Sequence, residues 1–182
     1  PVHRLDRATS GCLLFAKNEE VLPSLKSLFM DRAIEKRYLC IVRGIPAQSE
    51  GLIDHPLTSE RSGKLQEAQS KYRVLLESEQ PFDSTGRYPT SRYSLLEVEL
   101  LTGRTHQIRV HMEHIGHPLV GDPVYRQRRG PRLEGLPEFD RQALHARRLE
   151  LAHPVSGDFV EVNADAPDDF QALLAWARVS ND

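Results

Sequence analysis

The sequence predicts an α+β fold in which a mixed, largely antiparallel sheet is flanked by helices. Short alternating runs of β-forming residues fill the middle of the chain, and apolar residues recur at helical spacing near both ends. A turn sequence at 153–157 separates two further alternating runs. With 182 residues, 39% hydrophobic and 27% charged, the composition is that of a globular protein, and we expect one domain over 1–182.

The first part of the chain predicts one helix among several strands. A short apolar run predicts a buried strand over 11–17, and Asn18 can then cap a helix. The apolar positions of that helix are Val21, Leu22, Leu25, Leu28 and Phe29. Further strands are predicted over 35–44, 51–57, 68–76 and 92–101.

The second part predicts a helix, a hairpin and a final helix. Ile108, Met112 and Ile115 share one face of a helix over 105–115, and Gly116 follows as a stop signal. Strands over 143–152 and 158–163 flank the turn. A last helix begins near Pro167, with apolar positions Phe170, Leu173, Leu174 and Ala177 and with Asp165 or Asp168 near its positive end. The segment 126–137 is rich in Arg, Gly and Pro and predicts an exposed loop.

Composition excludes several classes of protein. No apolar run approaches the roughly 18 residues that a membrane-spanning helix needs. Cys12 and Cys40 lie in no CxxC spacing and cannot form a disulfide framework, which favours a reducing, cytoplasmic setting. The net charge is −2, so a nucleic-acid partner would have to be held by a local basic surface. The chain opens on Pro1 without a signal peptide, and we expect it to be a fragment.

The first polar cluster is the run from His3 to Arg7. Asp6 lies between Arg4 and Arg7, whose charges would favour its carboxylate form and hold it in place. Such a carboxylate could act as a nucleophile or a base. The alternative is a turn-capping Asp in an ordinary surface ion pair.

The second polar cluster spans 102–111. Gly103 precedes a predicted helix start with Arg104, His106 and Arg109 in its first turns, so backbone N–H groups and cations could face a phosphate or carboxylate. The alternative is a solvated helix face. Four histidines fall close together here, namely His106, His111, His114 and His117. A zinc site is one interpretation of this cluster. Neither HExxH nor a Cys partner is present, however, and we expect no metal.

Four blocks of the sequence resemble, in order, the signature blocks of the RluA family of pseudouridine synthases. They read HRLDRATSG at 3–11, EKRYLCIVRG at 35–44, LLTGRTHQIRVHMEHIGHPLVGDPVY at 100–125 and LHARRLELAHPVSG at 144–157. The resemblance implies a pseudouridine synthase catalytic domain that isomerises a uridine in RNA without a cofactor. It also implies that the chain lacks the family's N-terminal part, which in many members includes an S4-like RNA-binding domain.

The resemblance assigns roles to individual residues. Asp6 matches the catalytic carboxylate, and Arg109 is the expected cationic partner, with Arg104 as the rival. Tyr38 matches the aromatic residue that stacks on the flipped base; its alternative is an ordinary cross-strand contact. Arg4 matches the residue that fills the space left by the flipped nucleotide, and it could instead simply pair with Asp6. Arg104 and His106 are further expected substrate-binding residues.

RNA is the expected partner, held mainly through phosphate contacts. The candidate cations are Arg126, Arg128, Arg129 and Arg132, followed by Arg147 and Arg148; the alternative is a solvated face. The acidic residues Asp165, Asp168 and Asp169 are expected to lie away from RNA.

The residues do not decide which RNA is the substrate. The stretch 86–111 resembles the TruC branch, which acts on tRNA, whereas 103–125 and the FDRQALHA run resemble the RluD branch, which acts on large-subunit rRNA. We expect a monomer with no membrane association. Two alternatives from other classes are a non-catalytic RNA-binding module and a metal-dependent hydrolase that uses the histidines.

Overall fold

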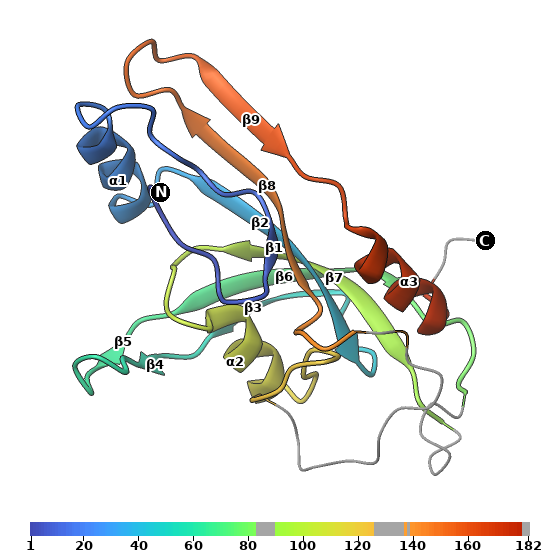
Figure 1. The fold of residues 1–182 in the computed structure, drawn as a ribbon. Helices are drawn as coiled ribbons and strands as arrows, with labels where there is room; N and C mark the ends of the chain where they lie inside the picture. Colours follow the sequence, from blue (N-terminus) through green and yellow to red (C-terminus); the bar gives the residue numbers. More distant parts are fainter. Residues whose placement is uncertain (83–89, 126–136, 138, 180–182) are drawn as a thin grey trace.

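The computed structural model describes residues 1–82, 90–125, 137 and 139–179. In these residues a seven-stranded sheet has the order β1-β8-β2-β7-β6-β3, with β9 also paired to β8 (Figure 1). The strands are β1 Ser10–Gly11, β2 Glu35–Arg43, β3 Glu50–Asp54, β6 Gln69–Glu77, β7 Tyr93–Leu100, β8 Leu144–Ala152 and β9 Phe159–Asn163. The β1–β8 pair is parallel and the other pairs are antiparallel. The predicted fold class is confirmed.

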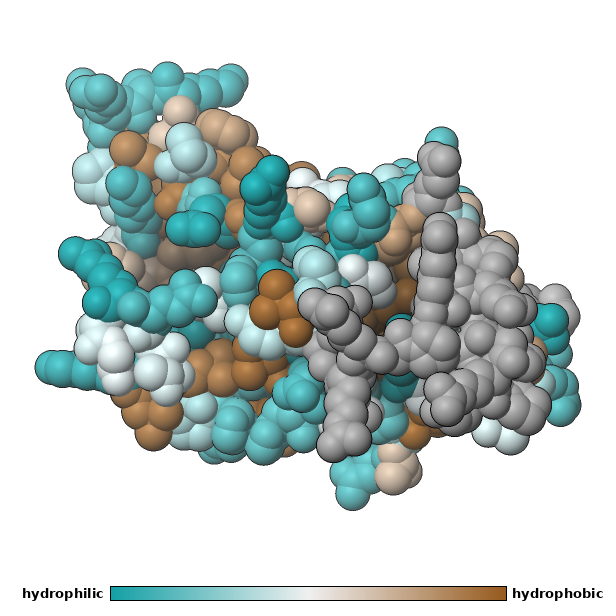
Figure 2. Space-filling view, turned by 60° about the horizontal axis from the view of Figure 1, so that its bottom comes forward, coloured by the Kyte–Doolittle hydropathy of each residue, from teal (hydrophilic) through white to brown (hydrophobic). Residues whose placement is uncertain are grey.

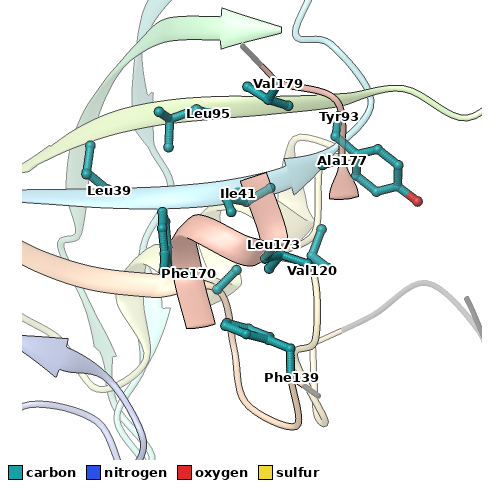
Figure 3. Close-up of a cluster of buried hydrophobic side chains, with 11 residues drawn as sticks. Leu39, Ile41, Tyr93, Leu95, Val120, Phe139, Phe170, Leu173, Ala177 and Val179 are labelled. Carbon is teal, nitrogen blue, oxygen red and sulfur yellow. The ribbon is translucent and has the colours of Figure 1, made fainter. Parts of the chain in front are cut away.

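Three helices are described, and two of them cover opposite faces of the sheet. They are α1 Leu22–Met30, α2 Gln107–His114 and α3 Asp168–Trp176. Neighbouring residues of β2 point to different faces: Ile41 belongs to a buried cluster with Phe170 of α3 (Figure 3), whereas Cys40 belongs to one with Met112 of α2. The alternation in β2 therefore places α2 on one face and α3 on the other.

Helix α1 lies on the same face as α2. Its buried residue Leu25 packs in a cluster with Leu149 of β8. Leu149 stands opposite Lys36 in the β2–β8 register, and Lys36 shares a face of β2 with Tyr38, two residues further on. Tyr38 in turn packs in the α2 cluster. Helices α1 and α2 therefore flank the first part of β2 from one side.

The predicted strand over 11–17 is wrong, because only Ser10–Gly11 pairs with the sheet. The N–H of Cys12 still donates to the carbonyl of Ala146, but the outer edge of β8 is occupied by β9 from Arg148 onward. The chain therefore leaves the sheet, and Leu14 pairs instead with the N–H of Val2. Residues 12–16 therefore belong to no strand of the sheet.

The predicted cap of the first helix is also misplaced. Asn18 accepts a hydrogen bond from the N–H of Val21, one residue before α1 begins at Leu22. Pro23 lies in the first turn of α1, where its missing N–H needs no partner. Asn18 thus stabilises the turn that leads into the helix rather than the helix itself.

The predicted strand over 51–57 divides into two elements. Strand β3 ends at Asp54, and Leu57–Thr58 forms β4, which pairs with β5, Leu65–Gln66, in a separate two-stranded sheet (Figure 1). The remaining predicted elements are confirmed to within one or two residues. Of the predicted loop over 126–137, only residue 137 lies in the described part. No described helix is long and apolar enough to cross a membrane.

Candidate active site

A cavity of about 420 Å³ opens between α1, α2 and the N-terminal loop. Its walls come from the end of α1 and the segment that leads into α2, and β2 contributes Lys36 and Tyr38. The lining residues with ionisable or aromatic side chains include His3, Arg4, Asp6, Arg32, Lys36, Tyr38 and Arg104. Both polar clusters predicted from the sequence therefore meet at one cavity. The surface in Figure 2 is hydrophilic over most of its area, with smaller apolar patches.

The loop that carries Asp6 is a tight turn fixed from both sides. The carbonyl of Asp6 accepts the N–H of Thr9 at 2.9 Å, and Ala8 between them has a φ of 68°. The side-chain amide of Gln142 donates to the carbonyl of Arg7 at 2.8 Å and to the hydroxyl of Thr9 at 2.9 Å. The loop is thus tied to the segment that leads into β8.

Arg109 is the cation that pairs with Asp6. Its Nη1 lies 3.9 Å from the Asp6 Oδ2, and their side chains are 5% and 22% exposed. The rival Arg104 turns away and donates from Nε to the carbonyl of Glu67 at 2.9 Å. Within the described residues, the two arginines that flank Asp6 in the sequence form no ion pair with it.

A second carboxylate, Asp122, holds Arg109 more tightly. Its oxygens accept from Nε of Arg109 at 2.7 Å and from Nη2 at 2.9 Å, and its side chain is fully buried. It also accepts the N–H groups of Val124 and Tyr125. Burial alone would raise the pKa of Asp122, but these hydrogen bonds and the guanidinium charge hold it below its ordinary value. The same bonds raise the pKa of Arg109.

Tyr125 and His106 complete the surroundings of Arg109. The guanidinium carbon lies 4.9 Å from the centre of the Tyr125 ring, and the Tyr125 hydroxyl hydrogen-bonds Nδ1 of His106 at 3.0 Å. His106 precedes α2 with a φ of 56°. Asp122 and Tyr125 were not singled out from the sequence, although both lie in the GDPVY end of a quoted block.

Tyr38 and Arg4 face the cavity in different ways. Tyr38 is only 8% exposed, and burial, with the nearby charge of Asp6, raises the pKa of its phenol. Its ring lines the same cavity as the Asp6 side chain, on the β2 side. Arg4 is exposed and lines the cavity from the N-terminal loop. The aromatic ring of Tyr38 and the long, exposed side chain of Arg4 thus border the space beside the Asp6 carboxylate.

Gln107 anchors the start of α2 to β6, a role that the sequence did not reveal. Its Oε1 accepts from the hydroxyl of Thr102 at 2.6 Å and from the N–H of Arg104 at 3.0 Å. Its Nε2 donates to the carbonyl of Gln69 and the hydroxyl of Ser70, both at 2.9 Å. A fully bonded buried amide of this kind makes the segment rigid.

The clustered histidines have separate partners. His111 is buried between the Ser70 hydroxyl and the carbonyl of His55, and burial lowers its pKa. His114 stacks on His55 at 3.7 Å between ring centres, while His117 hydrogen-bonds a carbonyl of β2. In the described part of the chain, no group of His, Cys, Asp or Glu side chains is arranged to hold a metal ion.

The predicted phosphate contacts are only partly described. Arg126, Arg128, Arg129 and Arg132 lie outside the described residues. Arg148 forms ion pairs with Glu150 and Glu161, so its charge is already matched, whereas Arg147 is exposed.

Comparison with known proteins gives this geometry a context. A family model described as RNA pseudouridylate synthase matches residues 1–114, which contain Asp6, Tyr38 and Arg109. The chain belongs to this family. It is 39% identical to tRNA pseudouridine synthase C of Vibrio parahaemolyticus over 96% of this chain and 74% of that protein. It is 38% identical to ribosomal large subunit pseudouridine synthase D of Zymomonas mobilis over 99% of this chain and 56% of that protein.

Solved structures of the family have the same fold. The structure titled Human RNA Pseudouridylate Synthase Domain Containing 4 superposes with a TM-score of 0.79 at 25% identity, over 99% of this chain and 76% of that one. Human RNA Pseudouridylate Synthase Domain Containing 1 gives a TM-score of 0.71 at 30% identity, over 91% and 68%. The resemblance to the RluA family and the pseudouridine synthase type of fold are therefore confirmed.

Proposed function

We propose that this chain is a pseudouridine synthase catalytic domain that isomerises a specific uridine in RNA to pseudouridine. The observation that carries the proposal is the Asp6 carboxylate at the cavity wall, with Arg109 beside it at 3.9 Å and with Arg109 itself fixed by Asp122. A preorganised cation next to a carboxylate can orient it without reorganising during the reaction. The family membership supports the same activity.

The reaction needs no group from outside the protein and RNA. The bond between N1 of uracil and C1′ of ribose breaks, the base turns within the cavity, and C5 bonds to C1′. The hydrogen of C5 leaves as a proton, and N1, freed from C1′, gains a proton. Asp6 acts either as a nucleophile at the sugar or as the base that takes a proton from it. Arg109 is a positioning residue in this scheme, because it acts through Asp6.

The other cavity residues are proposed to bind the nucleotide. Tyr38 stacks on the uracil that leaves the RNA stack, which suits a buried aromatic ring at the cavity wall. Arg4 occupies the position that the flipped nucleotide leaves. Arg104 and His106 are also proposed to bind the substrate; Arg104 lines the cavity and is held by the carbonyl of Glu67, whereas His106 lies outside the cavity lining and hydrogen-bonds Tyr125.

The substrate is proposed as rRNA or tRNA. The names of the similar proteins divide between these two RNA classes, and recognition of folded RNA depends on contacts spread over loops. A cytoplasmic location and a monomeric state remain predictions. The two cysteines are unpaired and buried, which is compatible with a reducing compartment. A non-catalytic RNA-binding module is the alternative function.

Tritium release from the uracil C5 tests the activity. The parent chain is incubated with tRNA and rRNA transcripts that carry 5-tritiated uridine, without added metal. We expect release by the parent, none by Asp6→Asn, and RNA binding by Asp6→Asn within a few-fold of the parent. The control variant is Asp158→Asn, which changes an exposed carboxylate in the β8–β9 turn.

Two outcomes would contradict the proposal, one concerning Asp6 and one concerning the activity itself. Turnover by Asp6→Asn would refute the role of Asp6. RNA binding by a folded parent that releases no tritium from either RNA would favour the binding module.

A further inference from the structure

Lys36 is a largely buried lysine that lines the cavity and has no partner for its ammonium among the described residues. It lies in β2, is 9% exposed, and lines the cavity two residues before Tyr38. Its Nζ lies beside Gly103, where a Cβ atom would come within 3.6 Å of it. In the described residues the Lys36 ammonium has no hydrogen bond and no ion pair. The Lys36 Nζ is not among the fully buried side-chain nitrogens that lack a partner in the described residues, so the stem of Lys36 is buried while its charged tip reaches the cavity.

The other cations of the cavity differ from Lys36. Arg32 is paired with the carboxylate of Glu67 at 2.9 Å, and Arg104 donates to the carbonyl of the same residue. Arg4 is exposed to water. Of these four lining cations, Lys36 is the one that is largely buried and has no hydrogen bond or ion pair to a described residue.

The charge of the cavity is also unbalanced. Its described lining contains Arg4, Arg32, Lys36 and Arg104 but only the carboxylate of Asp6, and that carboxylate pairs with Arg109. Burial lowers the pKa of Lys36, and the charge of Arg32 lowers it further. An anion that enters the cavity would therefore find an ammonium group that no described carboxylate neutralises.

We propose that Lys36 is a substrate-binding residue whose ammonium receives an RNA phosphate next to the flipped uridine. This inference rests on the proposed function, because it takes an RNA nucleotide as the occupant of the cavity. A phosphate supplies the full negative charge that the uracil carbonyls lack, and each phosphate that a protein neutralises releases condensed counterions. The base would then stack against Tyr38 while Lys36, on the same face of β2, holds the backbone beside it.

Salt-dependent RNA binding tests this role separately from turnover. All variants are built on Asp6→Asn, and the dissociation constant for a tRNA or rRNA transcript is measured at a series of KCl concentrations. We expect Lys36→Met to weaken binding about tenfold at low salt and to reduce the slope of log K against log[salt] by roughly 0.7 to 1. Lys36→Arg, which keeps the charge, should retain the parent slope.

The matched control is Lys71→Met. Lys71 is 55% exposed, lies 3.8 Å from Glu99 and lines a different cavity, so its removal should leave the slope unchanged. Thermal unfolding distinguishes this role from a structural one, because loss of a structural residue would lower the melting temperature. Lys36→Met should melt at the same temperature as its parent or higher, because it keeps the buried apolar stem and removes a charge that is partly desolvated.

Three outcomes would overturn the proposal. They are an unchanged slope in folded Lys36→Met, a lower melting temperature in both Lys36 variants, and an equal change of slope in Lys71→Met. Absence of tritium release by the parent would refute the proposed function, whereas the salt slope would still decide whether Lys36 contacts phosphate.

Discussion

Arg109 is shared unequally by two carboxylates. Asp122 takes two hydrogen bonds from it at 2.7 and 2.9 Å, while Asp6 lies 3.9 Å away. The bidentate contact fixes the plane of the guanidinium, so Nη1 remains directed at Asp6. Asp122 is thus the residue that positions the cation, and Asp6 keeps an open side toward the cavity.

We predict that Asp122→Asn lowers both stability and turnover. Removing one member of a buried ion pair leaves an uncompensated charge, which costs about 3–5 kcal/mol. The free energy of unfolding at pH 7, from urea denaturation, should fall by this amount, and kcat should fall more than KM rises. Glu99→Gln is the control, because its exposed pair with Lys71 contributes at most about 1 kcal/mol. Equal losses in the two variants would contradict the assignment.

The difference in unfolding free energy between the parent and Asp122→Asn should depend on pH in one direction. The folded-state pKa of Asp122 lies below its ordinary value of 3.8, so its stabilisation is fully present above that pH and is lost as pH falls through the folded pKa. The gap in unfolding free energy between the parent and Asp122→Asn should therefore narrow only below about pH 4. A gap that narrows between pH 5 and 7 would point to another group.

The segment between α2 and β8 depends on a glycine next to Asp122. Gly121 has a φ of +74°, and a Cβ there would lie 2.2 Å from the carbonyl oxygen of Arg141. Gly157, in the β8–β9 turn, has a φ of +77°, but nothing lies within 4 Å of its Cβ position. The two positions thus share the backbone conformation and differ in the space around it.

Gly121→Ala should therefore be much more harmful than Gly157→Ala. In both variants the left-handed conformation of Ala costs about 1–2 kcal/mol of stability. Gly121→Ala must in addition displace the backbone carbonyl of Arg141. Thermal unfolding should show a clearly larger loss for Gly121→Ala, together with reduced tritium release as Asp122 shifts. Similar melting temperatures for the two variants would indicate that the segment adapts at little cost.

The sheet separates the cavity from the apolar cluster that contains α3. Helices α1 and α2 border the cavity on one face, while Phe170 and Leu173 of α3 pack on the other (Figure 3). The α3 cluster and the candidate site therefore lie on different faces of the same strands.

Phe170→Ala should consequently affect folding without affecting the site. Loss of this fully buried ring costs about 3–5 kcal/mol. At a temperature where the variant remains folded, its kcat/KM should stay near the parent value. Phe159→Ala, at a position 67% exposed in β9, should change stability by about 0.5 kcal/mol or less. A matching fall in kcat/KM for folded Phe170→Ala would show that the two faces are coupled.

The sequence by itself determined most of the strands, the helical faces and the family. The alternation in β2 and the apolar spacing of α2 and α3 are short-range patterns, and they depend only on which side of an element each residue takes. The family blocks identified Asp6, Tyr38 and Arg109 as candidates, and each of these lies at or next to the cavity.

Only the tertiary structure decided which groups meet. It paired Asp6 with Arg109 rather than Arg104, brought in Asp122, and placed Lys36 at the cavity with no ion pair to any described residue. It also ended β1 after Gly11, because β9 occupies the edge of β8 that a longer strand would need. These outcomes depend on distances between segments far apart in the chain and on competition for one sheet edge. A local pattern of residues predicts neither.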